Sequence, residues 1–152
     1  MATHNLIQYF TTGSTGADIM NRVTIETFVP SGDFDAGDAV CFDADKEGSE
    51  RVVFVKAKAA DNSNLQYFAG IALQGSSVTG SDGRRACEVA VGGYVEGAKV
   101  NTGVSKGEYL VADAVVGQFS GSATWPSSPV FGTALEDDTA GKADVILWQK
   151  AF

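Results

Sequence analysis

The residues able to carry out acid–base, nucleophilic or metal chemistry are few in this chain and lie far apart. The single histidine, His4, is close to the start, and the two cysteines, Cys41 and Cys87, lie in separate apolar runs. A nucleophile needs a base beside it, and a zinc site needs a closed set of ligands. The sequence offers neither arrangement, so we expect no catalytic residues and no metal site, and we expect both cysteines to be buried thiols.

One acidic segment partly matches a calcium-binding loop. Asp43, Asp45, Glu47 and Gly48 occupy the first, third, fifth and sixth positions of such a loop. The twelfth position, which normally carries a bidentate glutamate, is Phe54, and a strand rather than a helix is expected there. We therefore interpret the segment as a solvated acidic turn, with calcium binding as the weaker alternative.

Charge and composition argue against several classes of function. The formal net charge is −8, and the basic residues are scattered apart from Arg84 and Arg85, so we expect no basic surface for nucleic acid. The sequence has no phosphate-binding glycine motif and no apolar run long enough to cross a bilayer. It therefore predicts a protein that is not an enzyme, needs no cofactor and binds neither nucleic acid nor membrane.

The elements that would position any site are predicted to be short strands. From Arg22 onward, β-branched and aromatic runs alternate with Gly, Asp, Ser and Pro, without a helical period. This pattern predicts an all-β fold, a small antiparallel β-barrel or sandwich over residues 22–152, with a flexible N-terminal arm and hinge over residues 1–21 and long loops at Ser76–Gly83 and Ser120–Pro129. The expected strands are Arg22–Phe28, Ala39–Asp43, Arg51–Lys58, Tyr67–Leu73, Cys87–Val91, Tyr94–Val100, Tyr109–Ala112, Gly117–Ser120, Val130–Leu135 and Ala143–Gln149.

Two of these strands carry more specific expectations. The later half of Arg51–Lys58 alternates apolar and basic residues, so Lys56 and Lys58 are expected to face water. Val145–Trp148 is apolar throughout, which is typical of a strand buried on both faces or covered by a neighbouring subunit. We assign Trp148 to the core and Trp125 to a loop folded back on the barrel.

Parts of the chain repeat each other. Phe68–Leu73 and Val130–Leu135 share Gly-x-Ala-Leu, and each precedes a polar turn and a Val-rich strand. Asp33–Val40 and Gly103–Leu110 share a glycine, an acidic residue and then a strand. The pattern indicates one β-hairpin unit used twice. True duplication, shared turn chemistry and chance similarity are all open explanations.

Together these segments resemble the capsid decoration, or cement, proteins of tailed bacteriophages. The resemblance spans Asp33 to Trp148 and rests on the motifs Gly70–Leu73, Glu88–Val95, Gly103–Asp113, Val130–Glu136 and Ala143–Trp148. It implies a lambda-type β-module that clusters as a homotrimer on the outside of an icosahedral shell and stabilises it by bridging subunits of the major capsid protein. It also implies synthesis in the bacterial host cytoplasm and a final location on the virion.

The resemblance implies a contact role for the N-terminal arm, whereas the loop Ser120–Pro129 departs from the shortest members of the family and is assigned a contact on its own residues. In lambda-type decoration proteins a flexible N-terminal segment becomes ordered on the capsid, which here implies a capsid-binding role for Asn5, Leu6, Ile7, Gln8, Tyr9 and Phe10. The alternatives are that these residues form the first strand of the domain or pack on a sister subunit. Trp125 and Pro126 are expected to contact a subunit or the capsid, because Trp is enriched in binding hot spots. The alternative function is a head-binding or receptor- or carbohydrate-binding module of a phage tail fibre or spike.

Overall fold

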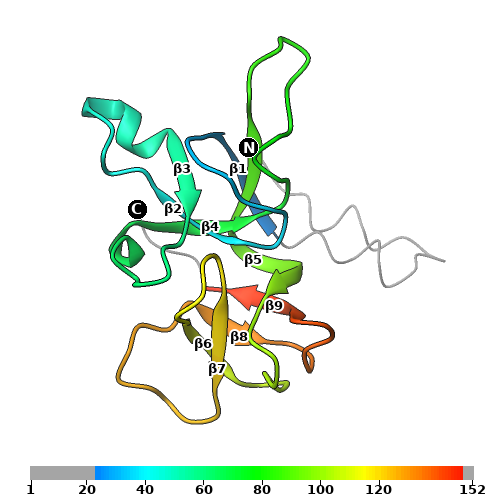
Figure 1. Ribbon diagram of the computed structural model, residues 1–152. Helices are drawn as coiled ribbons and strands as arrows, with labels where there is room; N and C mark the ends of the chain where they lie inside the picture. Colours follow the sequence, from blue (N-terminus) through cyan, green and yellow to red (C-terminus); the bar gives the residue numbers. More distant parts are fainter. Residues whose placement is uncertain (1–22, 149–152) are drawn as a thin grey trace, which may run out of the picture.

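The structure is a computed structural model that describes residues 23–148 (Figure 1). Within these residues the chain forms nine β-strands and two short 3-10 helices, so the expected all-β fold is confirmed. The strands are β1 (Val23–Pro30), β2 (Ala39–Phe42), β3 (Phe54–Ala57), β4 (Phe68–Ala72), β5 (Cys87–Lys99), β6 (Tyr109–Ala112), β7 (Phe119–Ser122), β8 (Gly132–Ala134) and β9 (Lys142–Leu147). The 3-10 helices are η3 (Gly48–Val52) and η4 (Leu65–Tyr67). Neither they nor any other helix in residues 23–148 has the length and apolar character of a membrane span.

The first half of the chain forms a closed five-stranded barrel, seen in the upper part of Figure 1. Strand β3 pairs parallel with β1 and antiparallel with β2, and β4 pairs with β2 and β5. Antiparallel pairing of β1 with β5 closes the ring. Because side chains alternate along each strand, one set points into the barrel. The buried members of this interior cluster are Phe28, Phe34, Val40, Val55, Ala69, Ala72, Cys87, Val89 and Val91.

Strands β5 to β9 repeat this arrangement in the lower part of Figure 1. The long strand β5 leaves the first barrel and pairs with β9, and β8 and β6 continue the sheet to β7. An isolated parallel bridge from Val100, the residue after β5, to Phe119 on β7 joins the two ends. It matches the parallel pairing of Pro30 with Val55 in the first barrel. Strand β5 therefore belongs to both barrels, as the last strand of one and the first of the other.

The hydrogen bonds of the two halves are also equivalent. At the start of β2, the Asp38 carboxylate accepts a bond from the Asp35 amide at 3.1 Å, and at the start of β6 the Glu108 carboxylate accepts one from the Ser105 amide at 3.0 Å. Backbone bonds match as well. In the first half the Gly37 amide donates to the Ala72 carbonyl and the Ala72 amide to the Asp38 carbonyl; in the second half the Gly107 amide donates to the Ala134 carbonyl and the Ala134 amide to the Glu108 carbonyl. Shared turn chemistry does not explain bonds between distant strands, so these matches favour duplication of the whole barrel.

The glycine of the repeated Gly-x-Ala-Leu motif has the same structural role in both halves. A Cβ atom on Gly70 would collide with the carbonyl oxygen of Ala90, and one on Gly132 would collide with the carbonyl oxygen of Ile146. In each case the strand after the turn lies too close for any side chain. The motif therefore recurs because both barrels need this close approach between neighbouring strands.

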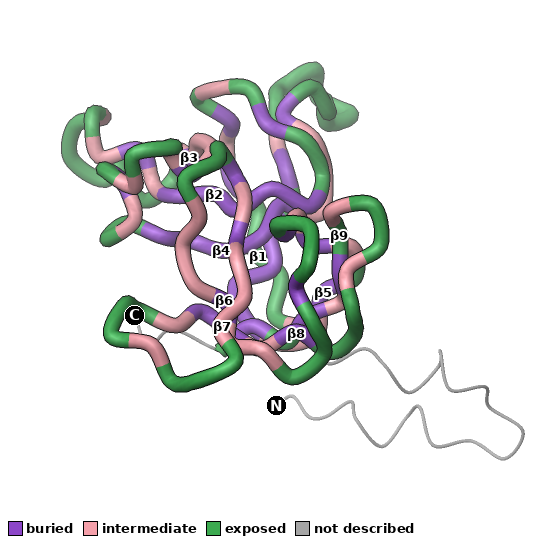
Figure 2. Tube along the Cα trace, turned by 60° about the horizontal axis from the view of Figure 1, so that its bottom comes forward, coloured by how far each residue is buried: buried purple, intermediate pink, exposed green. Residues whose placement is uncertain are grey.

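The two barrels share a continuous apolar core. Residues on the outer side of β2, β4 and β5 pack in the same cluster as the interior of the second barrel. The ring of Phe68 lies 5.7 Å from that of Phe119 and 4.7 Å from that of Phe131, measured between centroids. Figure 2 shows the buried parts of β2, β4 and β5 in the middle of the molecule and the long loops exposed around it. Both cysteines are buried as expected, and burial raises the pKa of the Cys87 thiol to about 11.

Several expected strand boundaries are wrong. The strand expected at Gly117–Ser120 lies two residues later, as β7 (Phe119–Ser122). Cys87–Val91 and Tyr94–Val100 form the single strand β5, because Gly92 and Gly93 continue the strand where it passes from one barrel to the next. Strand β3 begins at Phe54, since Arg51 and Val52 belong to η3.

The prediction that Lys58 faces water is also wrong. Strand β3 ends at Ala57, so Lys58 no longer follows the strand alternation and its side chain is completely buried. Its ammonium donates three hydrogen bonds, to the carbonyl oxygen of Ala59 (2.9 Å), to Oδ1 of Asn62 (2.7 Å) and to the carbonyl oxygen of Asp113 (2.8 Å). These bonds tie the loop before η4 to the end of β6. Lys56, by contrast, keeps 31% of its side chain exposed.

Candidate functional site

Three aromatic rings gather at the surface of the second barrel. Trp125, in the loop after β7, stacks on Trp148 with ring centroids 5.8 Å apart and an interplanar angle of 19°. Tyr109 on β6 lies edge-on to both, with centroids 5.3 Å from Trp125 and 6.3 Å from Trp148. Trp125 is 67% exposed and Trp148 is 42% exposed. Large aromatic surface therefore lies in contact with water.

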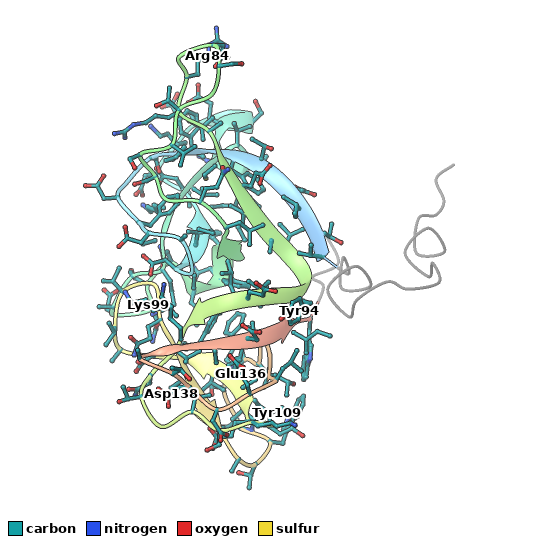
Figure 3. All side chains as sticks on the ribbon, turned by 90° about the vertical axis from the view of Figure 1, so that its right-hand side faces the viewer. Arg84, Tyr94, Lys99, Tyr109, Glu136 and Asp138 are labelled. Carbon is teal, nitrogen blue, oxygen red and sulfur yellow. The ribbon has the colours of Figure 1, made fainter. Side chains whose placement is uncertain are left out.

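These rings continue into an outward-facing row of side chains across the sheet, which we call the open face. The register places Ser122, Tyr109, Thr133, Ile146 and Tyr94 directly opposite one another on β7, β6, β8, β9 and β5. Ile146 is 41% exposed, and the other four side chains are half-buried. Figure 3 shows Tyr94 and Tyr109 on the same side of the second barrel. The open face thus combines aromatic, aliphatic and hydroxyl groups.

Carboxylates border the open face at the β5–β9 side. The Tyr94 hydroxyl donates to Oδ2 of Asp144 at 2.7 Å and lies 3.4 Å from Oε1 of Glu96. The hydrogen bond to Asp144 is the main cause that raises the pKa of the Tyr94 phenol, and burial adds to it. Tyr94 is therefore a neutral donor at physiological pH, and the carboxylates make this border acidic.

The residues for which the sequence predicted a position or a contact have different outcomes in the structure. Trp125 lies on a loop folded back on the barrel, as expected, and the half-buried Pro126 follows it. Trp148 does not belong to the core: Val145 and Leu147 on β9 point inward, whereas Ile146 on β9 and Trp148, the residue after it, are exposed. The interpretation of β9 as buried on both faces is therefore wrong within this chain. Asn5–Phe10 of the arm and His4 lie outside the described residues.

The acidic segment after β2 does not converge on a cation site. The Lys56 ammonium lies 2.9 Å from Oδ1 of Asp43 and 2.6 Å from Oδ2 of Asp45, so both carboxylates face a lysine. A hollow of about 600 Å³ at the surface is lined by residues 45–50 of this segment. Among residues 23–148, no three His, Cys, Asp or Glu side chains are grouped in a way that would hold a metal ion.

No family model matches the chain, and no curated protein matches it in sequence.

The open face has the chemistry of a docking surface. Exposed Trp and Tyr rings bury large areas on contact and are enriched where proteins bind partners. A contiguous exposed aromatic patch on a small domain marks an interaction site more often than an incidental surface.

Sequence reasoning missed the grouping of Tyr109 and Trp148 with Trp125. Val145–Trp148 is apolar throughout, so the signal that could have found it is strand geometry alone: successive side chains point to opposite faces, and the interior of one barrel takes only one face. The loop conformation that brings Trp125 over the other two rings has no such signal, because the contact joins residues from three separate elements.

Proposed function

We propose that the protein is a non-enzymatic structural protein that binds the outside of an icosahedral phage capsid and stabilises it by bridging subunits of the major capsid protein. The resemblance to capsid decoration proteins supports this partner, and its motifs lie on strands β4, β5, β6, β8 and β9 of the two barrels. Virion location and a homotrimeric arrangement on the shell belong to the same proposal.

The observation that carries a role in assembly is the open face with Trp125 and Trp148. A protein that acted alone in solution would gain nothing from stacked indole rings held in water. A protein that works as part of a larger assembly needs apolar surface to bury against its neighbours. The acidic net charge of −8 keeps copies soluble and apart until such a contact forms.

The proposed mechanism is mechanical. Each copy spans neighbouring capsid subunits, and each contact of about 1,200–2,000 Å² adds free energy that opposes rupture of the shell. Because many copies act on one shell, modest affinity at each contact produces a large combined effect. No chemical step is required of any side chain.

Co-sedimentation with purified heads tests this function. The protein is mixed with expanded and unexpanded heads of the phage that encodes it, and the pellets are imaged by electron microscopy. We expect saturable binding to expanded heads, in clusters related by threefold symmetry. Lack of binding to either form of head contradicts the proposal.

The arm prediction has its own test. Deletion of residues 1–12 is expected to leave cooperative unfolding unchanged and to abolish binding to heads, because Asn5–Phe10 supply the proposed capsid contact. Unchanged binding by the deletion variant contradicts the role of the arm while leaving the rest of the function standing.

Glycan binding by a tail-fibre module is the second candidate, and the grouping of Trp125 with Tyr109 favours it. Exposed aromatic rings beside polar groups provide a platform on which a sugar ring can stack. Quenching of tryptophan fluorescence by a glycan panel, lost on Trp125→Ala, is the expected result under this alternative. Absence of quenching removes it.

A further inference from the structure

The outer faces of the two barrels occupy equivalent positions in the duplicated fold. On the first barrel this face is formed by β2, β4 and β5, and on the second it is the open face of β6, β8 and β9. The shared register matches Ala39 with Tyr109, Cys41 with Val111, Ile71 with Thr133, Ala90 with Ile146 and Gly92 with Trp148.

On the first barrel this face is an interface. Ala39, Ile71 and Ala90 have no exposed surface, and they belong to one cluster with residues inside the second barrel. The Phe68 ring reaches from β4 to Phe119 and Phe131 across the same boundary. Small residues suit a face on which another barrel lies directly. The chain therefore already contains one contact in which a barrel covers this face.

On the second barrel the equivalent face is open, and its residues are larger at every matched position except Thr133, which replaces Ile71. Ile146 and Trp148, which take the positions of Ala90 and Gly92, are 41% and 42% exposed. An antiparallel sheet face that remains in water normally carries polar residues. Here it carries Tyr109, Val111, Ile146 and Trp148 beside the hydroxyl groups of Ser122 and Thr133, and the more exposed Trp125 stacks on top. The aromatic and aliphatic members are the residue types of a covered face.

We propose that a second copy of this chain covers the open face of the second barrel, with Trp125 as the anchoring side chain. The element that covers the equivalent face is a barrel of this same chain, and a second copy presents the same fold. The contact is apolar, so salt is expected to strengthen it by screening the repulsion between copies of charge −8. The contact would join neighbouring copies on the shell, and for that setting the inference rests on the proposed function.

Sedimentation velocity of the full-length protein tests the contact over a range of concentrations and at two salt concentrations. We expect self-association that increases with protein concentration and with salt concentration. Trp125→Ala is expected to raise the dissociation constant about 30-fold or more, as for a central tryptophan in an interface. Ile146→Glu, which places a charge on the open face, is expected to abolish association, and far-UV circular dichroism checks that both variants are folded.

Val52→Ala is the matched control. Val52 is 59% exposed on η3, in the cyan segment of the first barrel in Figure 1, so its truncation removes exposed apolar surface far from the open face. It should leave the dissociation constant unchanged. A wild-type protein that stays monomeric over the whole range overturns the proposal, as does association that persists unchanged in both folded variants.

Head binding by the same proteins separates this inference from the proposed function. Self-association without binding to heads contradicts the function and supports the contact between copies. Binding to heads by a protein that is strictly monomeric in solution contradicts the contact and supports the function.

Discussion

Lys58 shows how a single charged residue can serve as a structural part of the core. Its ammonium is completely buried and bonded to three neutral oxygens, those of Ala59, Asn62 and Asp113. Burial lowers the pKa of Lys58, against the opposing effect of the nearby Cys41, Asp113 and Asp61. The three bonds compensate part of the cost of removing the charge from water.

Lys58→Met is expected to lower the free energy of unfolding by about 3 kcal/mol, because the side-chain volume is kept while three half-buried acceptors lose their charged donor. Urea denaturation followed by circular dichroism measures the loss. Lys106→Met, at an exposed lysine, is the control and should change stability by less than about 0.5 kcal/mol. A loss below about 1 kcal/mol for Lys58→Met would show that water replaces the ammonium.

Asp43 and Lys56 form a partly buried ion pair that makes stability depend on pH. Burial alone would raise the pKa of Asp43, but hydrogen bonds from Lys56, Ser31 and the Asp45 amide outweigh it and hold the pKa below 3.8. Hydrogen bonds to Asp45 and Asp43 raise the pKa of Lys56 above 10.5. The contribution of Asp43 to the free energy of unfolding is therefore complete above pH 3.8. It is lost as the pH falls through the lowered pKa that Asp43 has in the folded protein.

Asp43→Asn is expected to cost about 1–2 kcal/mol at neutral pH, and the difference from wild type should shrink steadily below pH 3.8. Denaturation curves at a series of acidic pH values measure this difference. Asp45→Asn is the control, because the Asp45 side chain is 85% exposed and should contribute less than about 1 kcal/mol. A difference that stays constant down to pH 2 would contradict the role of the Asp43 charge.

At the scale of the elements, each barrel depends on one close approach between strands. Gly70 on β4 faces the backbone of β5, and Gly132 on β8 faces that of β9, in equivalent registers. Both glycines are buried, so a side chain at either position has no solvent to move into. The loss of stability caused by adding a side chain should therefore be similar at Gly70 and Gly132.

Gly70→Ala and Gly132→Ala are each expected to lower the free energy of unfolding by about 3 kcal/mol, since the added methyl group forces the paired strands apart. Thermal unfolding of the two variants measures the effect. Gly32→Ala is the control, because a Cβ there lies 3.6 Å from Lys56 Cβ, an ordinary contact. A large loss in one variant with little change in the other would contradict the equivalence of the two barrels.

At the scale of the whole molecule, a shared strand and a shared core join the barrels. Strand β5 runs through both, and the outer face of the first barrel packs in the same cluster as the interior of the second. Neither barrel can lose its structure without exposing apolar surface of the other. We therefore expect the described part of the chain to unfold as one unit.

Unfolding curves from tryptophan fluorescence and from far-UV circular dichroism are expected to coincide, because both tryptophans lie on the second barrel while the dichroism reports both barrels. Phe68→Ala, at the contact between the barrels, should cost about 3–4 kcal/mol and keep the two curves together. Fluorescence that changes at a lower urea concentration than dichroism would show that the barrels unfold separately.

Four features of this protein follow from its amino-acid sequence alone: the all-β class, the position of most strands, the burial of both cysteines and the repeated hairpin unit. These features depend on local periodicity and turn chemistry, which act over a few residues. That the repeat extends to a whole barrel is visible only in the folded chain, since a single strand, β5, serves both halves.

Which outer faces are covered also depends on how the two barrels pack in the folded chain. Ala39 and Tyr109 occupy equivalent positions, yet one is fully buried and the other lies on the open face. Alternation along a strand tells which side chains enter a barrel but not whether another barrel lies outside it. For the same reason the burial of Lys58 escaped prediction, because it depends on Asp113, which lies far from Lys58 along the chain.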